Sequence, residues 1–123
     1  MTHDEVKAKT LSLLTAHGVH DWKVIVIGGM FSMLGETCDA ATRFELKEII
    51  INAAMADDEI MDTVTHEVAH VLTPGDGHGP RWLAKMIELG CSHANIEAAI
   101  QVYNLDRPGT GWQELARKKL IKE

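Results

Sequence analysis

The segment from residue 57 to residue 72 constrains the fold of this 123-residue chain more than any other part of the sequence. It begins with three consecutive acidic residues, which stabilise the first turn of a helix, and it ends just before Thr73 and Pro74, where helical geometry is disfavoured. On a helical wheel its apolar residues fall in one sector of about 120°, namely Ile60, Met61, Val64, Val68, Val71 and Leu72. We therefore predict a helix over residues 57–72 that buries one face.

Two histidines lie on the opposite side of this predicted helix. His66 and His70 fall at about 240° and 280° when Ile60 is set to zero, one turn apart, so both imidazoles can reach a single metal ion. Glu67, at about 340°, lies beside the pair but is turned from it, where a carboxylate can contact water at the metal without becoming a ligand. The HExxH pattern of residues 66–70 on an amphipathic helix therefore predicts a catalytic metal site. The alternative is a surface helix whose histidines are simply exposed.

A catalytic zinc site needs three protein ligands and an open position for water. The loop over residues 73–80 is dense in glycine and proline, so it can fold back toward the preceding helix. It offers His78 and Asp76 as candidate third ligands. We prefer His78 because the glycines on both sides of it let the backbone approach, and Asp76 stays the alternative. The metzincin pattern HExxHxxGxxH is excluded, since it needs a glycine where the chain has Thr73 and a histidine where it has Asp76.

The residues before this helix predict a first helix and three strands. Thr2 and Glu5 form a capping-box pattern and Gly18 is placed as a helix C-cap, so the first helix is expected over about residues 3–17. Runs rich in β-branched residues predict the strands, at residues 22–27, within residues 32–42, and over residues 46–53. We expect these strands to form one small sheet in which neighbours in sequence pair.

Helices are also expected after the histidine-bearing segment. Pro80 suits the first turn of a helix that runs to Gly90, and residues 95–103 predict a further short helix. A last amphipathic stretch covers residues 112–121. The fold class is therefore α+β, a minimal zincin-like domain with an N-terminal helix on a small three-stranded sheet, the HExxH helix and C-terminal helices. No repeat or linker divides the chain, so we expect a single domain over residues 1–123.

The charge balance argues against one large class of function. The chain carries 18 acidic and 12 basic side chains, which gives a formal net charge of −6. A free-standing nucleic-acid binder usually presents a basic surface, because contacts with phosphate supply much of its affinity. The charge therefore gives no support for a nucleic-acid partner.

The cysteines and the apolar stretches bear on the compartment. Cys38 and Cys91 are too few for a disulfide scaffold and fit a reducing environment. The first residues lack the basic region and apolar stretch of a signal peptide. The longest apolar stretch, residues 24–34, is interrupted and far shorter than the ~20 residues that a membrane helix needs. We therefore expect a cytoplasmic protein without a membrane partner.

Two motifs together resemble those of a known family. Residues 62–70, which end in the HExxH pattern, are followed by residues 77–82, Gly-His-Gly-Pro-Arg-Trp. This combination is similar to the SprT-like zinc metallopeptidases, whose pattern is HExxH, a short loop and then HGxxW or HGxxF at the start of the next helix. Residues 34–38 and 49–52 also resemble that family's strands. The resemblance covers about residues 30–90 and is far more specific than HExxH alone.

The resemblance implies that His66, His70 and His78 bind Zn²⁺ and that Glu67 is the catalytic general base. Many members of the family continue into a C-terminal zinc ribbon with paired CxxC motifs, and this chain contains no such motif. The family also includes a DNA-dependent protease that acts on DNA–protein crosslinks, so a nucleic-acid partner rests on the resemblance alone. The partner that the site itself predicts is a protein or peptide substrate.

The expected reaction is zinc-dependent hydrolysis of peptide bonds, which makes the chain a metalloendopeptidase. Zinc polarises the scissile carbonyl and lowers the pKa of water toward ~7, and Glu67 takes the proton of that water. The alternatives are a zinc-binding interaction module and a protease that is silent without DNA or a partner. The presence of Glu67 argues against a purely structural site, which needs no base.

The sequence says less about how a substrate is held. An extended substrate could pair with the strand near residues 49–53, which leads into the HExxH helix. Tyr103 and Arg107 carry groups that can stabilise an oxyanion, but nothing in the sequence places either residue near the metal.

Overall fold

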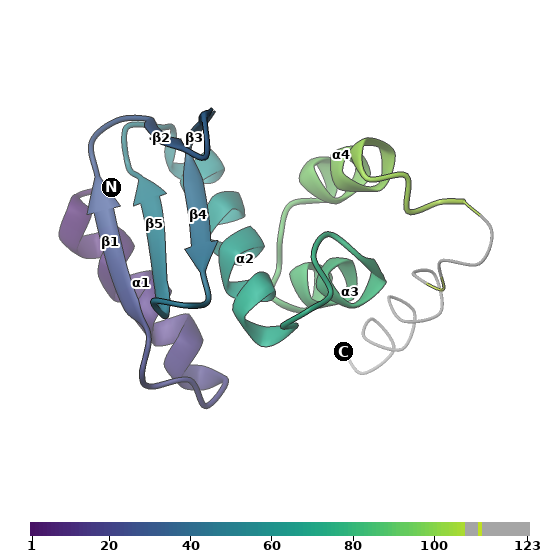
Figure 1. Ribbon diagram of the computed structural model, residues 1–123, viewed down its shortest axis with the longest axis horizontal. Coiled ribbons are helices and arrows are strands. Elements are labelled where there is room, and N and C mark those ends of the chain that lie inside the picture. The colour runs from purple at the N-terminus through teal and green to yellow at the C-terminus, as the bar shows by residue number, and fades with distance from the viewer. Residues whose placement is uncertain (108–110, 112–123) are drawn as a thin grey trace. The chain divides into compact units, whose positions relative to one another are not determined.

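The computed structural model describes residues 1–107 and residue 111, and the chain forms two compact units (Figure 1). The first unit is Met1–Val68 and the second begins at Ala69. The boundary between them lies inside one continuous helix, α2 (Asp57–Leu72). The single domain expected over residues 1–123 stays a prediction.

Helix α1 (His3–Ala16) begins where its capping box predicts. The Thr2 hydroxyl accepts a hydrogen bond from the Glu5 N–H group, and the Glu5 carboxylate accepts one from the Thr2 N–H group, each at 3.1 Å. Val6 and Leu14 are buried on one side of the helix. The first helix therefore forms as predicted, because reciprocal bonds satisfy donors that the helix itself leaves unpaired.

Three strands form one sheet with the order β1-β5-β4 (Figure 1). They are β1 (Lys23–Ile27), β4 (Ala40–Arg43) and β5 (Glu48–Asn52). β5 is parallel to β1 and antiparallel to β4. Ile49 and Ile51 of β5 are fully buried, so the most buried of the three strands lies in the middle of the sheet.

This strand order corrects two expectations. Pairing between neighbours in sequence holds for β4 and β5 but is wrong for β1, whose partner in the sheet is β5. Pairing of a substrate with residues 49–53 is also wrong, because both edges of β5 already bind neighbouring strands. Within the described sheet, β4 and β1 are the two edge strands.

The prediction of a single strand within residues 32–42 is wrong, because three short strands lie in this range or overlap its ends. β4 belongs to the three-stranded sheet, while β2 (Phe31–Met33) and β3 (Glu36–Cys38) form a separate antiparallel hairpin. The turn between β2 and β3 places Leu34 at φ 52° and Gly35 at φ 81°. Two consecutive residues with positive φ make the tight turn of a hairpin. The sequence did not predict this turn, because leucine is not a residue that usually adopts a positive φ.

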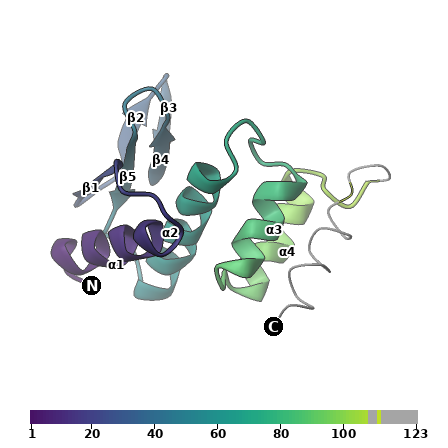
Figure 2. The same cartoon turned by 90° about the horizontal axis from the view of Figure 1, so that it is seen from below.

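Helix α1 and the first part of α2 cover the same face of the three-stranded sheet (Figure 2). Ile60, Val64 and Val68 of α2 have no exposed surface. They belong to the apolar sector that the helical wheel identifies, and α2 has the bounds predicted for it.

The second unit is built around α3 (Pro80–Glu88) and α4 (His93–Val102), which pack against each other. α4 begins two residues before the predicted start, because the Ser92 hydroxyl caps it by accepting a hydrogen bond from the Asn95 N–H group at 3.3 Å. The core of this unit gathers side chains from the end of α2, from α3, from α4 and from beyond it, namely Ala69, Trp82, Leu83, Met86, Ile96, Ala99, Ile100 and Leu105.

The architecture is α+β, with an N-terminal helix on a small three-stranded sheet followed by helices, and it is consistent with a minimal zincin-like domain. The amphipathic stretch predicted at residues 112–121 lies outside the described residues. No helix in the described part of the chain is long and apolar enough to cross a membrane.

Candidate metal centre

Helix α2 carries two of the three histidines of the candidate centre. His66 and His70 are half-buried, whereas Val64 and Val68 of the same helix are fully buried. The valines fix the rotation of the helix about its axis, so the histidines lie one turn apart away from the apolar face.

The third histidine, His78, lies in the loop between α2 and α3 and is exposed. Its Nε2 atom is 3.2 Å from Nε2 of His70. Each of His66, His70 and His78 offers one ligand atom, and these atoms lie within 4.8 Å of one another, so the three residues could hold a metal ion. Three imidazole nitrogens are a donor set that fits Zn²⁺ in a site with one position open for water. Asp76, the alternative third ligand, is not part of this group.

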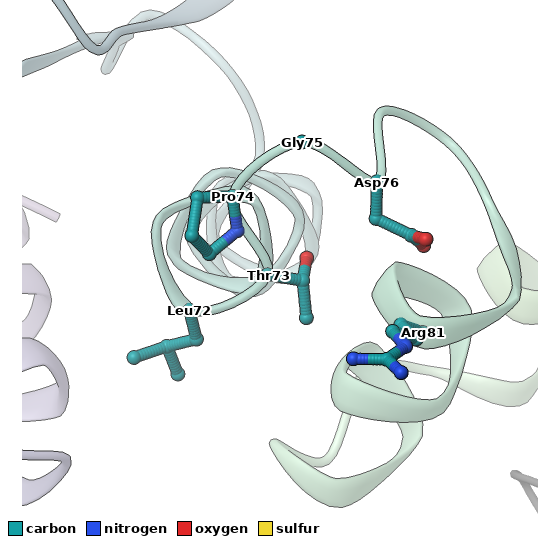
Figure 3. A pocket seen from close by; sticks show the side chains of 6 residues that line it. All are labelled: Leu72, Thr73, Pro74, Gly75, Asp76 and Arg81. Carbon is teal, nitrogen blue, oxygen red and sulfur yellow. The ribbon is translucent and has the colours of Figure 1, made fainter.

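Asp76 has a different role in the loop. Its Oδ2 atom accepts a hydrogen bond from the Trp82 N–H group at 2.9 Å, which caps the start of α3. Gly79 leaves room for this contact, because a Cβ atom there would lie 2.7 Å from that same Oδ2 atom. The loop also borders an open pocket of about 430 Å³, lined by Leu72, Thr73, Pro74, Gly75, Asp76 and Arg81 (Figure 3). None of the three histidines lines this pocket, so it is separate from the candidate centre.

Aromatic rings surround the two histidines of the second unit. The Trp82 ring has no exposed surface and stacks on His70, with ring centroids 5.4 Å apart and planes 17° apart. Tyr103 stacks on His78 at 4.0 Å and 13°, and Trp82 meets the edge of His78 at 4.8 Å. These contacts restrict the orientation of both imidazoles. Sequence reasoning did not place Tyr103 here, because Tyr103 is the C-cap residue that follows α4 and no local pattern links it to the loop.

Burial sets the charge state of these two imidazoles. It lowers the pKa of His70 to about 4, with a smaller contribution from His78 in the same direction and an opposing one from Asp76. It also lowers the pKa of His78. Both rings are therefore neutral near pH 7, and the neutral ring is the form that binds a metal ion.

Glu67 lies next to the histidines on the buried side of α2, with 6% of its surface exposed. Burial raises the pKa of its carboxyl to about 7, and a hydrogen bond from Thr42 acts in the opposite direction. The Thr42 hydroxyl donates to Glu67 Oε1 at 2.9 Å, while Glu67 Oε2 is 3.6 Å from His66 Nε2. Thr42 was not predicted as a site residue, because this contact joins residues 25 positions apart and no local pattern signals it.

In the comparison with protein families, the model of the SprT-like family matches residues 6–103. The chain belongs to the SprT-like family. The part that matches this family includes all of α2, the loop with His78, and α3 and α4, so all three histidines and Glu67 lie within it. Comparison with curated proteins and with solved structures found no match.

Proposed function

We propose that this member of the SprT-like family is a zinc metalloendopeptidase that hydrolyses peptide bonds in protein substrates. The observation that carries the proposal is the group of three imidazoles with the buried Glu67 carboxylate beside it. His66, His70 and His78 would hold Zn²⁺, whose donor preferences they match. When bound, the ion supplies Lewis-acid activation of the water and of the scissile carbonyl.

Glu67 is the general base of the proposed reaction. Its Oε2 atom faces His66, so the carboxylate lies beside the ligands without belonging to the three-histidine group. A carboxylate in this position accepts the proton of the attacking water and then returns it to the leaving amine, which completes cleavage of the peptide bond.

The substrate class that suits this site is an extended stretch of unfolded protein. β4 is an edge strand of the described sheet, so the backbone groups along its outer side can pair with an added strand. The same strand contacts the general base, because Thr42 lies in β4 and donates to Glu67. Substrate backbone paired with β4 is therefore brought alongside Glu67, and this edge replaces the central strand that the sequence suggested.

A cleavage assay on a denatured protein tests the proposal. The full chain is loaded with Zn²⁺, freed of excess metal, and incubated with the substrate in the presence and absence of DNA, with a chelator-treated sample as control. We expect one zinc per chain and cleavage that chelation abolishes. Zinc binding without cleavage under any condition would instead indicate an interaction module, and cleavage that needs DNA would indicate a regulated protease. A cytoplasmic location stays a prediction that cell fractionation tests.

A further inference from the structure

The contact between strand β4 and Glu67 suggests a role for a residue that the reaction scheme above does not use. We propose that Thr42 is a positioning residue for Glu67, whose hydroxyl holds Oε1 so that Oε2 faces the His66 imidazole. This inference rests on the proposed function for its catalytic consequence, but the placement of the carboxylate can be measured separately.

Thr42 is itself held in place by the sheet. It is paired with Ile49 of the central strand, and Ile49 has no exposed surface. A donor on a paired strand moves less than one on a loop, so it gives the carboxylate a fixed reference point.

The geometry divides the two carboxylate oxygens between two neighbours. A threonine hydroxyl has a single proton to donate, and here the acceptor at 2.9 Å is Glu67 Oε1. The other oxygen, Oε2, is the one that lies 3.6 Å from His66 Nε2. A glutamate side chain rotates about three bonds, and the hydrogen bond to Oε1 selects the conformation in which Oε2 faces the histidine side.

The same hydroxyl also lies 3.3 Å from the backbone oxygen of Glu67. A purely structural role, in which Thr42 ties β4 to α2, would use this second contact. The two roles differ in their consequences. Loss of a structural tie lowers stability, whereas loss of positioning lowers kcat at an unchanged zinc content and is reversed by any residue that restores the hydroxyl.

Variants of the full, zinc-loaded chain separate these roles. Thr42→Val keeps the shape of the side chain and removes the hydroxyl, and Thr42→Ser keeps the hydroxyl. Thr10→Val is the matched control, because Thr10 is buried in α1 and its hydroxyl donates to the Val6 backbone oxygen at 2.7 Å. Thr42→Ala replaces Thr42→Val if the latter does not fold.

We expect Thr42→Val to lower kcat on an unfolded protein substrate by about 10-fold or more, with KM and zinc content unchanged. The kcat of Thr42→Ser should stay within about threefold of the value for the unmodified chain, and the kcat of Thr10→Val should equal the value for the unmodified chain. In a Glu67→Gln background, Thr42→Val should cause no further loss, because the two residues act as one unit. An unchanged kcat in Thr42→Val, or an equal loss in both backgrounds, overturns the proposal.

Crystal structures of the zinc-loaded variants provide a readout that does not need turnover. In Thr42→Val the Glu67 carboxylate should leave the position in which Oε2 faces His66, and in Thr42→Ser it should stay there. If the unmodified chain binds zinc but cleaves nothing, the proposed function fails, and the position of Glu67 in these structures still decides whether Thr42 holds it. A carboxylate that is unmoved in Thr42→Val overturns the positioning role in either case.

Discussion

Replacement of Gly79 with alanine tests how the loop that carries His78 is held. A Cβ atom at this position would lie 2.7 Å from Asp76 Oδ2 and 2.8 Å from the backbone oxygen of Asp76. Both distances are well inside van der Waals contact, and the backbone atom cannot swing aside as the end of a side chain can. The Asp76 carboxylate is therefore expected to move away from the Trp82 N–H group, to which it is bonded at 2.9 Å.

The expected cost has two sources. Loss of a side-chain cap at the start of a helix destabilises a protein by about 1 kcal/mol. Overpacking against fixed atoms adds about 1–3 kcal/mol, so Gly79→Ala should lower the free energy of unfolding by about 2–4 kcal/mol in total. His78 is the neighbour of Gly79, so the displaced loop should also weaken zinc binding, by about 10–100-fold, as disturbed contacts behind metal ligands usually do.

Urea unfolding of the metal-free chain measures the loss of stability, and competition with a chelating dye measures the zinc affinity. Gly29→Ala is the matched control, because a Cβ atom at Gly29 meets nothing within 4 Å. This variant should stay within about 0.5 kcal/mol of the unmodified chain and bind zinc normally. A Gly79→Ala variant with unchanged stability and unchanged zinc affinity would refute the reasoning about the loop.

The other predictions concern the ligands and the rings beside them. His78→Ala should lose the one zinc per chain, whereas Asp76→Ala should keep it. Because Asp76→Ala removes the cap at the start of α3, its free energy of unfolding should fall by about 0.5–2 kcal/mol. Elemental analysis that finds zinc in His78→Ala but not in Asp76→Ala would make Asp76 the ligand. Removal of zinc by a chelator should lower the melting temperature, since the ion ties α2 to the loop, and an unchanged melting curve counts against this site. Tyr103→Ala should weaken zinc binding by about 2–10-fold in the dye assay, whereas Tyr103→Phe, which keeps the ring, should leave it unchanged. If Tyr103→Ala binds zinc as tightly as Tyr103→Phe, the stacking of Tyr103 on His78 does not contribute to zinc binding.

The helices and the placement of His66 and His70 on one side of α2 could be predicted because their determinants are local. The capping box of Thr2 and Glu5 sets the start of α1, and the acidic residues and Pro74 bound α2. The 3.6-residue period then places His66 and His70 on one side of α2, with Glu67 beside the pair but turned from it. Each of these inferences needs only residues within one or two turns of one another.

The parts that could not be predicted depend on contacts between residues far apart in the chain. The parallel pairing of β1 with β5 joins residues 25 positions apart, such as Val24 and Ile49, and no turn sequence specifies it. The hairpin turn places Leu34 at a positive φ, where sequence patterns lead one to expect glycine or asparagine. Thr42 and Tyr103 reach the centre only through tertiary structure, so the residues that support the histidines and Glu67 are visible only once the chain is folded.

Zinc content and peptide hydrolysis, measured together on Glu67→Gln, test the central claim most directly. Glutamine keeps the shape of the side chain and an oxygen that can accept the Thr42 bond, but it cannot take a proton near neutral pH. The variant should keep one zinc per chain and cleave a denatured protein about 10²–10⁴-fold more slowly, while Glu59→Gln, at an exposed position of the same helix, should be unaffected. Undiminished cleavage by Glu67→Gln would contradict the account, and loss of zinc from it would make Glu67 a ligand instead of the base.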